Sequence, residues 1–596
     1  MDLHFTADEP TAEEQAAVDG VATLIRADGS KRTYLLPVLH AIQNRIGWIS
    51  PGALNYASRV LAVPPAEAFG VADFYGLLST RKQPPAVAHI CDDIACKVKG
   101  ADQLCAAMEK LHGPEGSSAD GKATWYRSPC LGLCEYAPAV LVRTAGEKPN
   151  DQLLASPKAI DVETAMRGRQ IPQPILSSSV PQKGQPGLKL LRRVGQVNPE
   201  SLDDYRATGG FQALRRAIAM GPGEVIREVM ASKLVGRGGA AFPAGQKWNA
   251  VRLTSLPRYL VCNADESEPG TTKDRVILEG DPYALVESMI IAGYATGCEQ
   301  GYLYIRGEYP LSARRMEHAI RECRSRGFLG DNILGDGVRF DIEIRIGAGA
   351  YICGEETALL NSIEGNRGEP RNKPPFPTQV GLFGRPTVIN NVETLINVPH
   401  IVLEGGEAFA AIGTAGSTGT KLFCLSGHVA RPGVYEAPFG VTLRQLLDMA
   451  GGIAGSGKLQ AVLIGGAAGA FVGPNDLDIP MTFEGTRAAG ATLGSAVVMP
   501  FDDAVDLRGI LLRIASFFRD ESCGQCVPCR VGTVRQEEIL HRLHCGKPLS
   551  SPGGEVVLLK EVGQAMRDAS ICGLGQTASS AIESALARFP VFGGKP

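Results

Sequence analysis

The segment Cys523-Gly-Gln-Cys526-Val-Pro-Cys529 places three cysteines at regular intervals, and Cys572 is a fourth, isolated cysteine. Three thiolates at this spacing can bind one face of a cubane iron–sulfur cluster, which a distant fourth thiolate completes. Helical patterns flank the loop, so we predict a helical [4Fe–4S] domain over 503–596. A helix predicted over 578–587 follows Cys572, and its N-terminal dipole would favour an anionic cluster. Zinc is the alternative, although zinc sites usually pair two C-x2-C knuckles.

A second set of four cysteines lies nearer the N-terminus, as the pairs Cys91/Cys96 and Cys130/Cys134. Short strand-like and helical runs alternate around them, which predicts a small α/β domain over 83–168. Four ligands from two loops of one such domain suit a [2Fe–2S] centre. The spacing alone leaves a zinc site or a redox-active disulfide open.

Bulk composition bears on the class of function. The 596 residues carry a net charge of −3, whereas nucleic-acid-binding proteins usually carry a basic excess. We find no apolar run of the roughly 18–20 residues that a membrane span needs, and no apolar core of a signal peptide. We therefore expect a cytoplasmic protein without direct membrane insertion. Its fifteen cysteines favour metal or cluster ligation, because disulfides are rare in the cytosol.

The remaining segments also differ in pattern. Residues 1–82 show helical periodicity, and the proline-, serine- and glutamine-rich stretch 169–189 is typical of a linker. Residues 190–415 alternate strand-like and helical runs with many glycines, which predicts an α/β ligand-binding domain. Residues 416–502 are rich in strand-like runs with one helix and predict a β-grasp-like module.

A glycine-rich segment lies early in the α/β domain: Gly236-Arg-Gly-Gly-Ala-Ala-Phe-Pro-Ala-Gly-Gln-Lys247-Trp248. Glycines let the backbone approach a phosphate closely, exposed N–H groups can bind it, and Lys247 adds positive charge. The segment lacks the third glycine of the dinucleotide fingerprint G-x-G-x-x-G. A tight structural loop is the alternative interpretation.

Two polar segments each follow a strand-like run: Asn263-Ala-Asp-Glu-Ser-Glu-Pro-Gly270 and Gly347-Ala-Gly-Ala-Tyr-Ile-Cys-Gly-Glu-Glu356. Ligands of α/β proteins bind at strand ends, so both are candidates for a binding site, with solvated acidic turns as the alternative. A third segment, Gly452–Leu459, nearly matches the Walker A loop. We reject it because Leu459 replaces the Mg²⁺-binding Ser/Thr and a helix, not a strand, is predicted before it.

Taken in order, these segments resemble the NADH-binding flavoprotein of respiratory complex I and its soluble relatives. The resemblance spans about 190–596 and also includes Lys273–Arg275, Pro374–Pro377 and Ile389–Thr394. The N-terminal 170 residues resemble the thioredoxin-like [2Fe–2S] subunit that partners this flavoprotein. Fusion of both parts most resembles the diaphorase subunit of NAD-reducing soluble [NiFe] hydrogenases. An equivalent subunit of an NAD-dependent formate dehydrogenase or of complex I is the alternative.

The resemblance implies FMN, NAD(H), one [4Fe–4S] cluster and one [2Fe–2S] cluster as cofactors. The residues that it assigns to FMN are Gly236, Arg237, Gly238, Lys247, Asn263, Asp265, Tyr351, Gly354, Asn390 and Asn391. Those that it assigns to NADH are Phe242, Glu268, Glu356 and Phe376. It assigns Cys523, Cys526, Cys529 and Cys572 to the [4Fe–4S] cluster, and Cys91, Cys96, Cys130 and Cys134 to the [2Fe–2S] cluster. The residues that depart from the family pattern are Val235, Ala241 and Ala250.

The implied activity is that of an NADH:acceptor oxidoreductase. Hydride would pass between NAD(H) and FMN, and single electrons between FMN and the clusters, with no side chain needed as acid or base. The expected physiological direction is reduction of NAD⁺ with electrons from a hydrogenase module. Expected partners are an iron–sulfur relay subunit and hydrogenase subunits, without nucleic acid. The rival interpretations are a scaffold with zinc-filled cysteine sites and an electron-relay subunit that has lost nucleotide binding.

Overall fold

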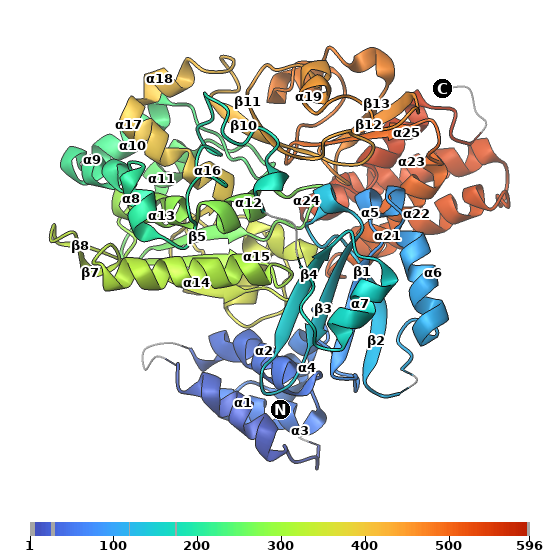
Figure 1. The fold of residues 1–596 in the computed structure, drawn as a ribbon, viewed down its shortest axis with the longest axis horizontal. Coiled ribbons are helices and arrows are strands. Elements are labelled where there is room, and N and C mark those ends of the chain that lie inside the picture. Colours follow the sequence, from blue (N-terminus) through green and yellow to red (C-terminus); the bar gives the residue numbers. More distant parts are fainter. Residues whose placement is uncertain (1–5, 26–29, 119, 173–175, 593–596) are drawn as a thin grey trace.

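The computed structural model describes residues 6–25, 30–118, 120–172 and 176–592. Helices surround three separate β-sheets, and regions of different architecture follow one another along the chain (Figure 1). The predicted multidomain α/β fold is confirmed. No helix in the described ranges is both long enough and apolar enough to cross a membrane. The exact domain boundaries remain a prediction.

The N-terminal region is helical, as predicted. Thr11 caps its first helix through a reciprocal capping box with Glu14. Apolar residues of these helices belong to the same hydrophobic core as Tyr304 and Phe517, which lie much later in the sequence, so this region packs onto the rest of the chain. The helices are α1 (Ala12–Ala22), α2 (Leu35–Ile46), α3 (Pro51–Leu61) and α4 (Pro65–Ala72), with a 3-10 turn over Lys31–Tyr34.

The next region is a four-stranded sheet with helices on its faces. The sheet order is β2-β1-β3-β4, and β1 pairs in parallel with β2. Cys91 ends β1 in register with Ser128 of β2, so the cysteines that follow both strands lie at one edge of the sheet. The elements are β1 (Ala86–Cys91), α5 (Ile94–Val98), α6 (Ala101–His112), β2 (Ala123–Ser128), β3 (Ala139–Thr144), β4 (Asn150–Ala155) and α7 (Ala159–Met166).

The predicted linker is tied down at its C-terminal end. The carboxylate of Glu436, on β11 (Gly433–Pro438), accepts hydrogen bonds from the backbone N–H groups of Lys189, Leu190 and Leu191. Gln182 forms two further hydrogen bonds with the backbone of Glu436, at 3.1 and 2.7 Å. This part of the stretch is therefore a packed strap and not a free spacer.

The third region holds a sheet in the order β7-β8-β6-β5-β9, whose last four strands run parallel. Its strands are β5 (Tyr259–Ala264), β6 (Gln300–Ile305), β7 (Gly330–Ile333), β8 (Val338–Ile346) and β9 (Thr387–Asn391). Its helices are α8 (Leu202–Ala207), α9 (Gln212–Met220), α10 (Pro222–Ala231), α11 (Ala244–Arg252), α12 (Lys273–Gly280), α13 (Pro282–Thr296), α14 (Pro310–Ser325), α15 (Glu356–Ile363), α16 (Val392–Ile396), α17 (Val398–Glu404) and α18 (Gly406–Ala410).

The fourth region is a mixed sheet in the order β11-β10-β14-β12-β13. Helix α19 does precede the rejected Walker-like segment, as predicted. Besides β11, its elements are β10 (Thr420–Leu425), α19 (Leu443–Met449), β12 (Leu459–Ile464), β13 (Ala470–Val472), α20 (Phe483–Ala488) and β14 (Val497–Asp502).

The C-terminal region is helical, as predicted, with one correction. The helix predicted over 578–587 is present as α25 (Ser580–Arg588), but a shorter helix precedes it and begins at Gly573, with Cys572 as its N-cap residue. The glycines and small polar residues of this turn gave no apolar periodicity by which to predict it. The helices are α21 (Leu507–Asp520), α22 (Val527–His544), α23 (Pro552–Ala569), α24 (Gly573–Thr577) and α25 (Ser580–Arg588).

Candidate redox site

A cavity of about 410 Å³ lies where the parallel strands of the third region end. The segments after β5 and β8 and the end of β9 meet there because parallel strands present their carboxyl ends at one sheet edge. The volume falls in the range of roughly 300–1,000 Å³ typical of small-molecule sites. Six of the ten residues predicted to bind FMN line it: Gly238, Asn263, Asp265, Tyr351, Gly354 and Asn391.

The glycine-rich segment contributes Gly238 and Gly239 to this wall. A Cβ atom on Gly238 would lie 3.3 Å from that of Asn391, and Gly239 has a φ of +121°, which disfavours other residues. Gly236 lies farther back, and a Cβ there would make only ordinary contacts. The requirement for glycine is therefore sharpest at the two positions that line the cavity.

The Arg237 side chain is not part of the cavity lining, and its contact with FMN stays a prediction. Its guanidinium donates a 2.6 Å hydrogen bond to the carbonyl of Thr418 and lies 4.6 Å from the ring centroid of Phe439. The side chain is fully buried, which lowers its pKa to about 10. Arg237 therefore joins the third region to the fourth, a contact between distant segments that no local pattern could reveal.

Hydrogen bonds fix the polar wall of the cavity. Asn263 donates to the carbonyl of Gly354 at 2.9 Å and accepts from the backbone of Asp265 at 3.0 Å, so it ties two of the strand-end segments together. The Oδ2 atom of Asp265 is buried and has no partner within the described residues. Burial raises the pKa of Asp265 well above its usual value. An unsatisfied polar atom at a cavity wall is suited to a ligand donor.

A buried charge network that we did not assign from the sequence lies behind Asn391. Lys273 bonds Asp274 at 2.7 Å and the Asn391 amide oxygen at 3.2 Å. It also pairs with Glu393 at 3.2 Å, and Glu393 in turn pairs with Lys421 at 2.5 Å. Lys273 and Asp274 line the cavity, so the network holds its floor. The sequence showed the Lys273–Arg275 motif but not that β10 brings Lys421 to it.

Glu268 and Tyr351 meet at the cavity wall. The Tyr351 phenol donates a 2.6 Å hydrogen bond to Oε2 of Glu268, and the Ala468 N–H donates to Oε1 at 3.0 Å. Burial raises the pKa of Glu268 to about 7, even though the phenol and backbone donors act to lower it. This carboxyl therefore changes charge near neutral pH.

Lys247 and Asn390, both predicted to contact FMN, do not line the cavity. The Asn390 amide oxygen accepts a 2.8 Å hydrogen bond from the Trp248 indole, so the side chain supports α11 instead. The Lys247 ammonium lies 3.6 Å from Glu356 and 5.8 Å from the ring centroid of Phe242. The Lys247 ammonium also donates a 3.1 Å hydrogen bond to the carbonyl of Ile389 on β9, so it lies between residues assigned to NADH and the strand that carries Asn390 and Asn391.

Phe242 and Glu356, two of the residues predicted to contact NADH, lie around Lys247 in a more open zone, and Phe376 follows Lys373 by three positions in the chain. Phe242 and Phe376 are 52% and 51% exposed, which is unusual for such large apolar side chains. Glu356 pairs with Lys373 at 2.9 Å. Burial alone would raise the pKa of Glu356, but Lys247 and Lys373 together hold it below its usual value. The zone thus combines exposed aromatic rings with a carboxylate that stays ionised.

The C-terminal cysteine loop borders the same cavity. Cys526 is the N-cap of α22, Cys529 lies in its first turn, and Cys572 is the N-cap of α24. Gly573, Leu574 and Thr577 of α24 line the cavity. A Cβ atom on Gly575 would lie 2.9 Å from that of Cys529, so glycine lets the two cysteine segments approach closely. This cysteine set and the cavity therefore share a wall.

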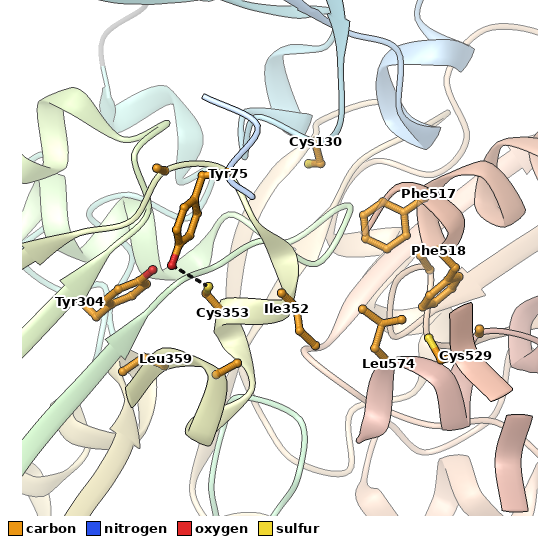
Figure 2. Close-up of a cluster of buried hydrophobic side chains, with 14 of the residues drawn as sticks. Tyr75, Cys130, Tyr304, Ile352, Cys353, Leu359, Phe517, Phe518, Cys529 and Leu574 are labelled. Atoms are coloured by element: carbon orange, nitrogen blue, oxygen red, sulfur yellow. Dashed lines mark hydrogen bonds between the residues drawn. The ribbon is translucent and has the colours of Figure 1, made fainter. Parts of the chain in front are cut away.

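The N-terminal cysteines also come together, and all four are buried. The Cys130 and Cys134 sulfurs are 3.4 Å apart, and Cys91 interacts with both Cys96 and Cys130. One apolar cluster contains Cys130 and Cys529 together with Ile352, Phe517 and Leu574 (Figure 2). Apolar packing thus continues between the two cysteine sites and the cavity wall.

The arrangement of thiols bears on the zinc alternative. Within the described part of the chain, no three His, Cys, Asp or Glu side chains form a group that could hold a single metal ion. A mononuclear zinc site needs four ligands around one centre. In a [2Fe–2S] or [4Fe–4S] cluster, four thiolates are shared among two or four irons, so fewer of them converge on any one atom. Each of the two sets consists of four cysteine thiols, which is the ligand set that both cluster types take.

Several cavity residues come from regions that sequence analysis did not connect with the site. Gly465, Ala468, Thr492, Gly494 and Ser495 belong to the β-grasp-like region and lie in loops without a recognisable motif. The glycine pair at 465–466 is the one local feature of these loops that points to a close contact. A Cβ atom on Gly466 would collide with the side chain of Glu268. Glu266 and Thr271 line the cavity from within a segment that was already a candidate.

Comparison with known families supports the same division of the chain. Four family models match, and they follow the order of the regions described above. They are a thioredoxin-like [2Fe–2S] ferredoxin (residues 21–152), the Nuo51 FMN-binding domain (229–400), the SLBB domain (422–466) and the NADH-ubiquinone oxidoreductase-F iron–sulfur binding region (509–591).

The chain covers most of the length of individual relatives. An NADH-quinone oxidoreductase subunit of Rhizobium meliloti is 46% identical over 67% of this chain and 95% of that protein. NADP-reducing hydrogenase subunit HndC of Solidesulfovibrio fructosivorans is 44% identical over 67% of this chain and 81% of that protein. A crystal structure of an NAD⁺-reducing [NiFe]-hydrogenase in the H2-reduced state matches with a TM-score of 0.80 at 33% identity, over 94% of this chain and 92% of that one. The chain therefore belongs to the NADH-binding flavoprotein family of NADH-quinone oxidoreductases and their hydrogenase relatives, with a thioredoxin-like [2Fe–2S] domain and a C-terminal iron–sulfur domain in the same polypeptide.

Proposed function

We propose that the chain is the NAD(H)-reacting diaphorase subunit of a larger redox complex in which a hydrogenase module exchanges electrons with it. FMN would occupy the cavity at the strand ends, a [4Fe–4S] cluster the Cys523, Cys526, Cys529 and Cys572 set, and a [2Fe–2S] cluster the N-terminal set. The observation that carries this proposal is the shared wall: α24 lines the cavity, and Cys572 caps α24. Flavin and cluster would thus be neighbours.

The donor sets fit these groups. The cavity offers closely approached glycine backbone at Gly238, an unpartnered Asp265 oxygen and the buried Lys273 network. Each cysteine set supplies the four thiols that a cluster needs. When bound, FMN exchanges a hydride with NAD(H) and single electrons with an iron–sulfur cluster.

The residues of the chain would bind the cofactor, fix its orientation and set the charge beside it. Gly238 and Gly239 let the backbone approach the cofactor, and Asn391 is held at the floor by Lys273 and Asp274. Glu268, fixed by the Tyr351 phenol, holds or loses a proton at Oε1 or Oε2 near neutral pH. In its anionic form it would favour the positively charged oxidised nicotinamide.

The open zone would receive the nucleotide. Phe242 and Phe376 offer exposed rings for stacking on the flat rings of NADH. Lys247 and Lys373 keep Glu356 ionised and lie where a phosphate or ribose could compete for them. Release of the nucleotide would then restore the Lys247–Glu356–Lys373 contacts, which keeps each charge partnered in both states.

The hydrogenase partner rests on likeness along nearly the whole chain. The matched crystal structure is of an NAD⁺-reducing [NiFe]-hydrogenase and covers 94% of this chain. The NADH-quinone oxidoreductase subunits and the hydrogenase subunit HndC each match 67% of it. A single chain of the hydrogenase structure thus corresponds to both the N-terminal part and the flavoprotein part of this chain, which supports a hydrogenase complex.

The test uses the native complex, isolated anaerobically with its partners. Hydrogen and, in a separate run, formate are supplied, and NAD⁺ reduction is followed by absorbance. NADH formed from hydrogen is the expected result. NADH formed only from formate would overturn the hydrogenase assignment, and failure of NADH to reduce either the flavin or an artificial dye would overturn the diaphorase assignment itself.

A further inference from the structure

The loop between Cys130 and Cys134 is held by residues of another region. Arg306, directly after β6, donates from Nη2 to the carbonyl of Cys130 at 2.6 Å. Its Nη1 donates to the carbonyl of Glu266 at 2.6 Å. Glu266 lines the flavin cavity. A single guanidinium therefore bonds both the N-terminal cysteine loop and the cavity wall.

Neighbouring contacts make this junction tight. Arg275 donates from Nε to the carbonyl of Gly132 at 2.9 Å and forms a short ion pair with Glu135. A Cβ atom on Gly132 would overlap the Tyr309 ring, so the loop backbone lies directly against that ring. The loop cannot move away from the third region without breaking several buried bonds.

Arg306 places a positive charge that is almost fully shielded from solvent next to Cys130, one of the four N-terminal cysteines. It is 3% exposed, its only ion-pair partner within the described residues is Glu308 at 2.6 Å, and its Nε atom has no partner among them. An iron–sulfur cluster gains negative charge on reduction, and hydrogen bonds and fixed charges near it set its potential. A buried cation acts strongly on such a change because the local dielectric constant is low.

We propose that Arg306 is a positioning residue of the N-terminal [2Fe–2S] centre, which fixes the Cys130 loop against the flavin cavity and holds the reduction potential of that centre high. The inference rests on the proposed [2Fe–2S] assignment of the four N-terminal cysteines. Arg306 touches no reacting atom, and it acts through the Cys130 carbonyl and through its charge. Glu308 moderates that charge, so the pair together sets the potential.

The test compares Arg306→Gln, Arg306→Lys and Glu308→Gln in the full complex. The midpoint potentials of the [2Fe–2S] and [4Fe–4S] signals are measured by redox titration followed by EPR. Arg345→Gln is the matched control: Arg345 is likewise buried, pairs with Glu343 at 2.6 Å, bonds the carbonyl of Thr33 at 2.8 Å and leaves Nε unpartnered. It joins the N-terminal region to β8 without touching the cysteine loop.

We expect the [2Fe–2S] potential to be lower in Arg306→Gln than in the unmodified complex and higher in Glu308→Gln. In Arg306→Lys, which keeps the positive charge, it should stay close to that of the unmodified complex. The [4Fe–4S] potential should stay constant in all three, and Arg345→Gln should change neither. An unchanged [2Fe–2S] potential in Arg306→Gln, with the cluster present, would overturn the inference. If Arg306→Gln loses its [2Fe–2S] cluster, the Glu308→Gln variant decides the question. A lower or unchanged [2Fe–2S] potential in Glu308→Gln would also overturn the inference. Absence of any [2Fe–2S] signal in the unmodified complex would instead refute the proposed function.

Discussion

The Tyr351 phenol and the Glu268 carboxylate meet at 2.6 Å on the wall of the flavin cavity, and they come from the two segments that follow β8 and β5. Because burial raises the pKa of Glu268 to about 7, its charge should control nucleotide preference. We expect the KM for NAD⁺ to fall as pH rises through 7, since ionised Glu268 attracts the cationic nicotinamide. Glu268→Gln should flatten this dependence. An identical pH profile in the variant would contradict the assignment.

The same group should affect stability with a defined sign. A partly buried carboxyl with a raised pKa, such as Glu268, stabilises the fold at pH values below its unfolded pKa of 4.5, and this stability is lost as pH rises to about 7. The free energy of unfolding of the unloaded chain should therefore fall over this interval by an amount on the order of 3 kcal/mol from Glu268 alone. Denaturation at several pH values, compared with Glu268→Gln, measures the difference.

Glu356 should affect the nucleotide and not the flavin. It lies with Lys247, Lys373 and the exposed rings, away from the cavity lining. Glu356→Gln should raise the KM for NADH by about tenfold, the effect of losing one hydrogen bond to a charged group. Flavin content, read from the absorbance of the released cofactor, should be unchanged. Loss of flavin with normal nucleotide affinity would show that the residue belongs to the other site.

Gly575 should be essential for the C-terminal cluster. A Cβ there would press on Ser570 and lie 2.9 Å from the Cβ of Cys529, so Gly575→Ala should displace the cysteine segments at a cost of about 1–3 kcal/mol. We expect loss of the [4Fe–4S] EPR signal with the [2Fe–2S] signal retained. Gly553→Ala in α23 is the control, because a Cβ there meets nothing within 4 Å. Equal effects of the two substitutions would argue against a tight cysteine site.

Glu393 should be the key residue of the buried charge network. It pairs with Lys273 at 3.2 Å and Lys421 at 2.5 Å, and none of the three side chains is more than 1% exposed. Glu393→Gln would leave the buried Lys421 ammonium without a counter-charge and Lys273 with Asp274 alone, and should destabilise the fold by about 3–5 kcal/mol. Thermal unfolding measures this. The exposed pair Arg444–Asp478 is the control, and Asp478→Asn should cost less than about 1 kcal/mol.

Local patterns predicted the elements well where periodicity was strong. The alternation of strand-like and helical runs over 190–415 is present, for example where α13 follows β5, and the strand-end position of Asn263 and Tyr351 followed from it. Contacts between buried side chains of distant segments could not be predicted from the sequence in this way. Nothing near Arg237 indicates that its side chain turns toward Phe439, some 200 residues later in the chain. Likewise, the charge network that joins Lys273 to Lys421 through Glu393 depends on packing between two regions, which periodicity within either one cannot encode.

The strap that Glu436 holds has a consequence for how the polypeptide assembles. The cysteine loop is already bound to the third region through Arg275 and Arg306, and the strap adds a peptide connection between surfaces that fit each other without it. The connection therefore acts mainly by raising the effective concentration of one part at the other. Cleavage of the chain within the strap should leave two fragments that remain associated, with a dissociation constant set by the buried arginine contacts. Joining the N-terminal part and the flavoprotein part in one polypeptide therefore ensures that the two are present in equal amounts and associate rapidly.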